Sequence, residues 1–207
     1  MNMRNPLVIE FTGTPNSGKT TLIKFLHDLL KSKGYHVEIK QEDAEIVPKC
    51  IPKKTWPRNV WITYGQLQSL IETKYSEADV ILLDRGFYDS KFWAEFLKIQ
   101  HVCTEEESLS LLKHLEDADK QFHLKPNWLF AIDVSTEVSL KRRYATINTE
   151  PVTLTTNAFI SLYKEELEKF YANVDVPLFK LDTSNLTLIE MQQLVLDKIT
   201  DILSNYN

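Results

Sequence analysis

The chain has 207 residues, enough for one domain whose core folds unaided, so we expect a single domain over residues 1–207. Apolar residues make up 43% and charged residues 26%, a mixture that excludes a disordered or fibrous protein. The net charge of −5 provides no broad basic field, which disfavours polymeric nucleic acid as a partner. No apolar run approaches the about 18 residues of a membrane span, and no signal peptide pattern begins the chain, so we expect a cytoplasmic protein without a membrane partner.

Apolar runs typical of strands alternate with helical periodicity, the pattern of a parallel sheet covered by helices on both faces. Five strands are expected, at residues 7–11, 35–40, 80–83, 128–132 and 176–181. Helices are expected after the glycine-rich turn as far as Gly34, and then near residues 60–75, 92–97, 104–122, 135–143 and 159–170 and after 187. Residues 47–57 hold three prolines and are expected as a loop. The pattern predicts an α/β protein with three layers.

Two of these helices begin with a recognisable cap. Thr104 with Glu107, and Thr187 with Glu190, have the spacing of a capping box. A polar segment from Ala145 to Pro151 has no apolar face and follows a basic helix end. We expect it to form a lid, spanning about residues 141–152.

Residues 13–20 read GTPNSGKT and match G-x-x-x-x-G-K-[ST] at every fixed position, between an expected strand and an expected helix. The glycines let successive N–H groups point at phosphate oxygens, and the start of the helix adds positive potential. Lys19 would reach the β- and γ-phosphates, and the Thr20 hydroxyl would ligate Mg²⁺. A chance glycine turn is disfavoured by this context. The expected nucleotide-binding residues are Gly13, Thr14, Pro15, Asn16, Ser17, Gly18, Lys19, Thr20 and Thr21.

A second part of the site is expected where the apolar strand 80–83 ends in Asp84 and Arg85. Asp84 is placed to hold Mg²⁺ together with Thr20. A helix-capping role for Asp84 stays open. Arg85 is expected either to bridge the donor and acceptor phosphates or to pair with an acidic neighbour.

Residues 84–92 read DRGFYDSKF, which resembles the Asp-Arg motif of thymidylate kinases and the Glu-Arg-Ser-x-Tyr-Ser motif of deoxynucleoside kinases. The resemblance extends in order over most of the chain, from the phosphate loop to an arginine-bearing lid. It implies a P-loop NTPase fold of the nucleotide kinase type, a five-stranded parallel sheet with the phosphate-loop strand at its centre, and ATP as donor. Gly86 and Asp89 depart from the pattern, which leaves the acceptor open.

The same resemblance implies roles for acceptor-side residues. Glu42 or Asp43, after the second strand, would be the general base, although a solvated acidic loop is an equal alternative. Gln66 would read a nucleobase edge, while Trp56, Trp61 or Tyr64 would stack on the base, unless these rings are ordinary core aromatics.

The resemblance also places lid arginines at Arg142 and Arg143. Closure would bring their charge to the transition state. A basic helix end that complements the macrodipole is the alternative. Residues 182–185 form a plausible loop on the adenine side, or simply a turn.

These features predict a kinase that moves the γ-phosphate of ATP, with Mg²⁺, to a nucleoside, a nucleotide or another small hydroxyl acceptor. A non-enzymatic ATP-binding sensor is the alternative, and a GTPase is disfavoured because no Asn-Lys-x-Asp motif is present. Besides Arg85, Arg58 is the arginine on the acceptor side that would suit a phosphate. The balance of acidic and basic residues on the acceptor side favours a neutral hydroxyl acceptor such as a nucleoside. Whether the protein forms a homodimer stays open.

Overall fold

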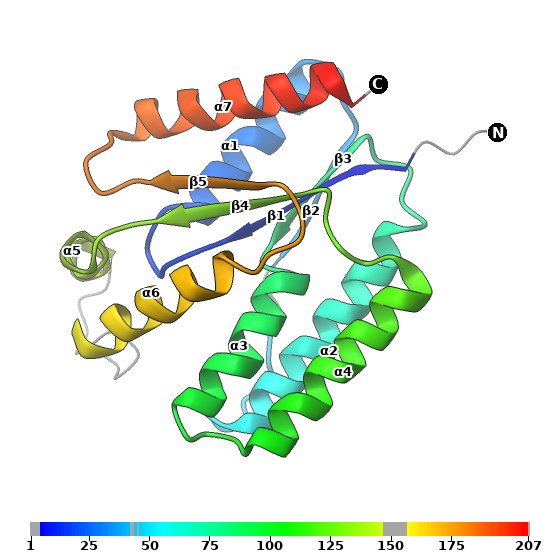
Figure 1. Ribbon diagram of the computed structural model, residues 1–207. Helices are drawn as coiled ribbons and strands as arrows, with labels where there is room; N and C mark the ends of the chain where they lie inside the picture. The colour runs from blue at the N-terminus through cyan, green and yellow to red at the C-terminus, as the bar shows by residue number, and fades with distance from the viewer. Residues whose placement is uncertain (1–4, 42–43, 45, 147–156, 207) are drawn as a thin grey trace.

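The computed structural model describes residues 5–41, 44, 46–146 and 157–206 (Figure 1). Among these residues, no helix combines the length and the apolar character needed to cross a lipid bilayer. The strands are β1 (Leu7–Thr12), β2 (Val37–Lys40), β3 (Val80–Asp84), β4 (Trp128–Asp133) and β5 (Leu178–Asp182). The helices are α1 (Lys19–Ser32), α2 (Trp56–Thr73), α3 (Phe87–Ile99), α4 (Glu105–Phe122), α5 (Thr136–Thr146), α6 (Asn157–Tyr171) and α7 (Leu188–Asn205).

The five strands form one parallel sheet in the order β2-β3-β1-β4-β5. β1 lies at the centre, paired with β3 through Phe11 and Asp84 and with β4 through Thr12 and Ala131. All six residues of β1 are buried, as expected for a strand covered on both faces. The predicted five-stranded sheet with the phosphate-loop strand at its centre is confirmed.

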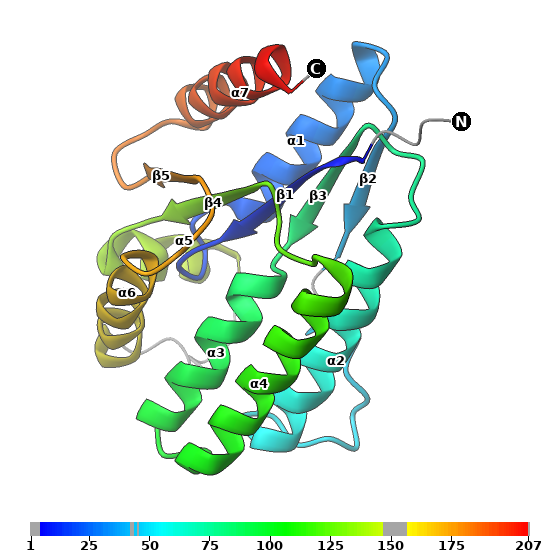
Figure 2. The same cartoon turned by 45° about the vertical axis from the view of Figure 1, so that its right-hand side comes forward.

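Helices cover both faces of the sheet and give the three predicted layers (Figure 1). On one face, α1 and α7 pack through residues such as Leu22, Leu26 and Val195. On the other face, α2, α3, α4 and α6 enclose a second core that contains Phe92 and Tyr163. Figure 2 shows α4 packed against the outside of α2 and α3. The carboxyl ends of β1 and β3 therefore lie between these two helical layers.

Both predicted capping boxes are present: the Thr104 hydroxyl accepts from Glu107 N, and the Thr187 hydroxyl accepts from Glu190 N. One boundary differs, because α2 begins at Trp56 and not near residue 60. Pro57 lies in its first turn, where the missing N–H costs no helical hydrogen bond.

Two further boundaries concern the site. α3 begins at Phe87, directly after the Asp84-Arg85 pair and earlier than the expected helix near 92–97. The expected lid at about 141–152 starts inside α5, and its remainder from residue 147 lies outside the described residues.

Candidate active site

The phosphate loop, residues 13–20, turns sharply between β1 and α1, and its glycines make the turn feasible. Gly13 and Gly18 have φ values of 128° and 100°, and Asn16 has a φ of 59°. A side chain at residue 13 would bring a Cβ within 2.1 Å of the Ile132 carbonyl oxygen on β4. Only glycine fits this position, because the loop backbone passes directly over the neighbouring strand.

Lys19 lies inside the curve of this loop. Its Nζ donates to the carbonyl oxygens of Gly13 and Thr14, at 3.1 and 2.8 Å. The side chain is only 7% exposed, so the ammonium group is held at the loop and not in bulk solvent. A fixed cation inside a phosphate loop is the arrangement that attracts terminal phosphates.

Helix α5 supports the phosphate loop through hydrogen bonds to its carbonyl oxygens. The Ser139 hydroxyl donates to Pro15 O at 2.8 Å, and Arg142 Nη1 donates to Asn16 O at 3.3 Å and to Ser17 O at 3.2 Å. Because the C=O and the following N–H of a trans peptide point in opposite directions, carbonyls held toward α5 turn the next N–H groups away from α5. Those N–H groups face the side where a phosphate would bind.

The segment after β5 completes this support. The Thr183 hydroxyl, which has one proton, lies 3.0 Å from both Ser17 O and Asp133 O and can donate to either of them. Arg142 donates to the Thr183 hydroxyl and carbonyl at 3.0 and 2.9 Å. The expected adenine-side loop at residues 182–185 is thus tied directly to the phosphate loop.

Asp133, at the end of β4, fixes the start of the loop. Its Oδ1 accepts from Thr14 N at 3.1 Å, and the Thr14 hydroxyl accepts from Val134 N at 2.9 Å. Burial raises the pKa of the Asp133 carboxyl above its ordinary range, against the opposing effects of this hydrogen bond and of Lys19. β4 therefore anchors the loop through one side chain and one peptide N–H.

Thr20 and Asp84 meet at the carboxyl edge of the sheet. Thr20 Oγ1 donates to Asp84 Oδ2 at 2.7 Å. Asp84 is only 7% exposed, and its Oδ1 accepts no hydrogen bond from any described residue. Two hard oxygen donors side by side, one with unused capacity, fit a divalent cation that prefers oxygen ligands and would take its remaining ligands from phosphate and water.

Arg85 follows in a strained conformation, with a φ of 71°. Its Nη1 donates to Asp89 Oδ1 at 2.8 Å, and its backbone N donates to Phe11 O at 3.0 Å. The Asp89 side chain is 2% exposed. The guanidinium thus pairs with an acidic neighbour, as one of the two expectations has it, and the bridging of donor and acceptor phosphates by Arg85 stays a prediction.

The acceptor side is partly assembled. Gln66 on α2 is 5% exposed, and its Oε1 accepts from the Ser90 hydroxyl in the first turn of α3. Trp61 is partly buried on α2, one and a half turns before Gln66. The general-base candidates Glu42 and Asp43 lie outside the described residues.

Two other acceptor-side candidates have different contacts from those expected. Tyr64 is 49% exposed, and its hydroxyl lies 3.4 Å from His114 Nδ1 on α4. Arg58 Nη2 donates to Ala44 O at 3.0 Å, so its guanidinium fastens the segment that precedes α2. These contacts weigh against base stacking by Tyr64 and against phosphate capture by Arg58.

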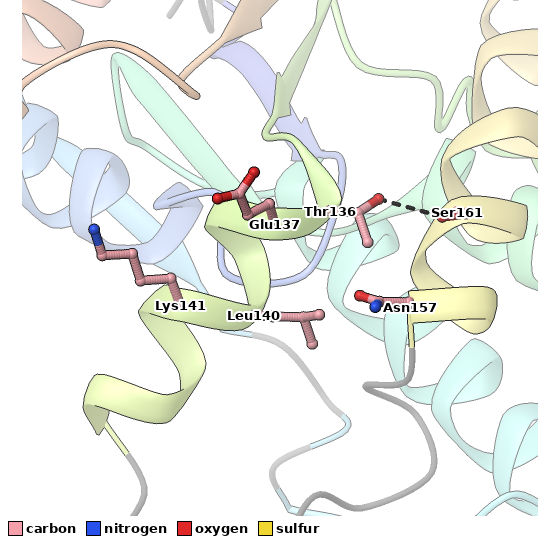
Figure 3. Close-up of a pocket in the computed structure, with 6 residues that line it drawn as sticks. All are labelled: Thr136, Glu137, Leu140, Lys141, Asn157 and Ser161. Atoms are coloured by element: carbon pink, nitrogen blue, oxygen red, sulfur yellow. Dashed lines mark hydrogen bonds between the residues drawn. The ribbon is translucent and has the colours of Figure 1, made fainter.

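Between α5 and α6 lies a cavity of about 640 Å³ (Figure 3). Its described lining residues are Thr136, Glu137, Leu140, Lys141, Asn157 and Ser161. The Thr136 and Ser161 hydroxyls meet across it at 3.4 Å. α5 thus has one side toward this cavity and another, through Ser139 and Arg142, toward the phosphate loop. Arg143, the second expected lid arginine, is partly buried near the end of the helix.

Sequence reasoning missed four residues that shape the site: Glu10, Ser90, Asp133 and Ser139. Asp133 carries the signal that identified Asp84, an acid at the end of an apolar strand. Glu10 is a charge inside an apolar run, which is costly unless a partner compensates it. Ser90 and Ser139 carry no such signal, because serine is common on helix surfaces.

Residues 8–148 match the family model described as AAA domain. The chain belongs to this family. A probable thymidylate kinase of Sulfurisphaera tokodaii is 28% identical over 145 residues, which cover 66% of this chain and 68% of that protein. The structure of deoxyadenosine kinase from M. mycoides with bound dCTP covers 94% of this chain and 99% of its own, with a TM-score of 0.72 and 18% identity. Together these likenesses confirm the predicted phosphate-loop kinase and its relationship to the nucleoside and nucleotide kinase group.

The position of Arg142 gives a testable result. Arg142→Ala removes the donors to Asn16 O and Ser17 O, so we expect weaker nucleotide binding and a lower kcat together, with a rise of about tenfold in Kd for the nucleotide. Calorimetric titration and steady-state kinetics measure the two effects, with the exposed Lys141→Ala as control. An unchanged Kd with a reduced kcat would contradict support of the loop and would restore the role of a lid arginine.

Proposed function

We propose that this protein transfers the γ-phosphate of ATP, in the presence of Mg²⁺, to a nucleoside or nucleotide. The observation that carries the proposal is the convergence of Lys19, the Thr20–Asp84 pair and Arg85 at the carboxyl edge of β1 and β3. A cation, two candidate metal ligands and a second cation stand around a loop whose carbonyls at residues 15–17 are held toward α5, so that the next N–H groups face the side where a phosphate would bind.

On the donor side, the loop N–H groups and Lys19 would bind the β- and γ-phosphates. Thr20 and Asp84 would hold Mg²⁺, which when bound neutralises phosphate charge. The tie between Thr183 and Ser17 O would keep the adenine-side loop in register with the phosphates.

On the acceptor side, Arg85 would steady the phosphoryl group as charge shifts between donor and acceptor. Its bond to Asp89 limits the freedom of the guanidinium, so less entropy is lost when the transition state forms. Arg143 stays a candidate for charge delivered on closure.

The charged side chains on the acceptor side favour one class of acceptor. A monophosphate acceptor needs fixed cations, preferably arginine, whereas a hydroxyl acceptor needs a base. Arg58 is engaged with Ala44 O, which favours a neutral hydroxyl acceptor such as a nucleoside. The two relatives are named for a nucleotide and for a nucleoside, so their names leave both classes open. Gln66, held by Ser90, would read the base edge.

Metal dependence tests the Thr20–Asp84 pair. Asp84→Asn replaces a carboxylate by a neutral amide, which holds a hard cation poorly. We expect a higher Mg²⁺ concentration for half-maximal rate and a lower kcat, measured by ADP release at varied Mg²⁺. A matched Asp79→Asn variant, at the edge of the sheet away from the loop, controls for charge. An unchanged Mg²⁺ requirement would return Asp84 to a capping role.

The acceptor class is tested by comparing matched nucleosides and their monophosphates. We expect kcat/KM to favour the nucleoside in wild type, to fall strongly in Glu42→Gln if that acid is the base, and to change little in Arg58→Ala. Asp43→Gln identifies the base if Glu42→Gln has no effect. A preference for the monophosphate that is lost in Arg58→Ala and indifferent to Glu42→Gln would overturn the nucleoside assignment.

A further inference from the structure

Glu10 is an ionisable residue in the central strand β1, every residue of which is buried. It lies on β1 between Leu83 of β3 and Leu129 of β4, and its exposed fraction is 0%. Burial raises the pKa of its carboxyl to about 8, despite hydrogen bonds that act in the opposite direction. A residue this costly to bury needs a compensating partner, and its contacts show what that partner is.

The partner is the start of α3. Glu10 Oε1 accepts from Asp89 N at 2.8 Å, and Oε2 accepts from Tyr88 N at 3.1 Å. The first N–H groups of a helix have no partner within the helix, and the N-cap residue here, Gly86, has no side chain to supply one. Glu10 therefore caps α3 from a neighbouring strand.

Gly86 is matched to this cap. A Cβ at residue 86 would lie 3.0 Å from both Cδ and Oε2 of Glu10, and 3.1 Å from a methyl group of Leu83. A side chain at residue 86 would press on the Glu10 carboxyl group, which caps α3 in place of an N-cap side chain. Gly86, which departs from the kinase motif that residues 84–92 resemble, thus leaves room for Glu10.

The capped turn of α3 is connected to Arg85 through Asp89. Thr12, two residues after Glu10 and so on the same face of β1, approaches Asp89 Oδ1 through its hydroxyl at 3.3 Å. The same Oδ1 accepts from Arg85 Nη1 at 2.8 Å. Asp89 is held through its backbone by Glu10 and through its side chain by Thr12, and it in turn holds the arginine.

We propose that Glu10 is a positioning residue of the kinase site, which fixes the first turn of α3 and, through Asp89, the guanidinium of Arg85. β1 then has two roles: it leads into the phosphate loop at its carboxyl end, and through Glu10 and Thr12 it positions Asp89, which pairs with Arg85. The inference rests on the proposed function, because Arg85 matters only if phosphoryl transfer occurs there.

The test uses Glu10→Gln, which keeps the shape but replaces one acceptor oxygen by an N–H₂ donor. We expect faster hydrogen exchange at the Tyr88 and Asp89 amides and a kcat lowered about tenfold to a hundredfold, with the KM for ATP changed less than about twofold. Adding Glu10→Gln to Arg85→Ala should lower kcat by no more than a further factor of about two, because the residue it positions is already gone.

Glu107→Gln is the matched control, since Glu107 also accepts a backbone N–H at a helix start, with Thr104 N at 2.8 Å, but far from the loop. It should lower the free energy of unfolding and leave kcat unchanged. If Glu10→Gln does not fold, Gly86→Ala presses on the same carboxyl and should give the same pattern of exchange and kinetics.

Equal losses of kcat from Glu10→Gln in the wild-type and Arg85→Ala backgrounds would overturn the proposal, as would unchanged exchange at Tyr88 and Asp89. A wild-type protein that turns over no acceptor would instead refute the proposed function. The exchange measurement needs no turnover and would still report on the cap, so the two failures are distinguishable.

Discussion

The structure depends on how the carbonyl oxygens of the phosphate loop are held. Lys19 binds those of Gly13 and Thr14, α5 binds those of residues 15–17, and the first helical hydrogen bond of α1, from Leu22 N, takes that of Gly18. Every carbonyl from residue 13 to residue 18 thus accepts a hydrogen bond, and those of residues 15–17, held toward α5, turn the N–H groups of residues 16–18 toward the side where an anion would bind. A loop without such support would spend binding energy on its own ordering.

This constraint explains why elements far apart in the sequence converge on one loop. β4 supplies Asp133, α5 supplies Ser139 and Arg142, and the segment after β5 supplies Thr183. Each lies at or just beyond the carboxyl edge of the sheet, where the loops that follow parallel strands lie close together. β3 adds Asp84 and Arg85 from the opposite side of β1. The strand order therefore sets the composition of the site.

Features that depend on neighbours in sequence were predictable. The phosphate loop, the strand that ends in Asp84 and the capping boxes at Thr104 and Thr187 follow from local spacing, and the structure has each of them. The start of α3 was not predictable, because Gly86 offers no cap and the group that replaces it comes from Glu10, 76 positions earlier. The direction in which a helical side chain points could not be predicted from the sequence either. Tyr64 could face the acceptor or α4, and only packing decides that it meets His114.

The roles of arginine illustrate the same limit. The sequence places Arg142 at a basic helix end and Arg58 just after a segment with three lysines, which suits anion binding in both cases. In the structure both guanidinium groups donate to backbone carbonyls, Arg142 to the phosphate loop and Arg58 to Ala44. Arginine has five donors and serves backbone support as readily as phosphate binding, so its role follows from its partners and not from its charge. Arg85 differs from both, because its Nη1 pairs with the buried carboxylate of Asp89, and it is the arginine to which we assign a role in the proposed transfer.

The fate of the γ-phosphate distinguishes a kinase from a protein that only binds or hydrolyses ATP. ATP labelled in its γ-phosphate is incubated with the protein, Mg²⁺ and a mixture of nucleosides and nucleoside monophosphates, and the labelled products are separated and identified. We expect label to move from ATP into a nucleoside or nucleotide, removal of Mg²⁺ to stop the transfer, and Lys19→Ala to abolish it while the exposed Lys24→Ala does not. Label that stays in ATP, or that appears only as inorganic phosphate whatever acceptor is present, would contradict the proposed kinase activity.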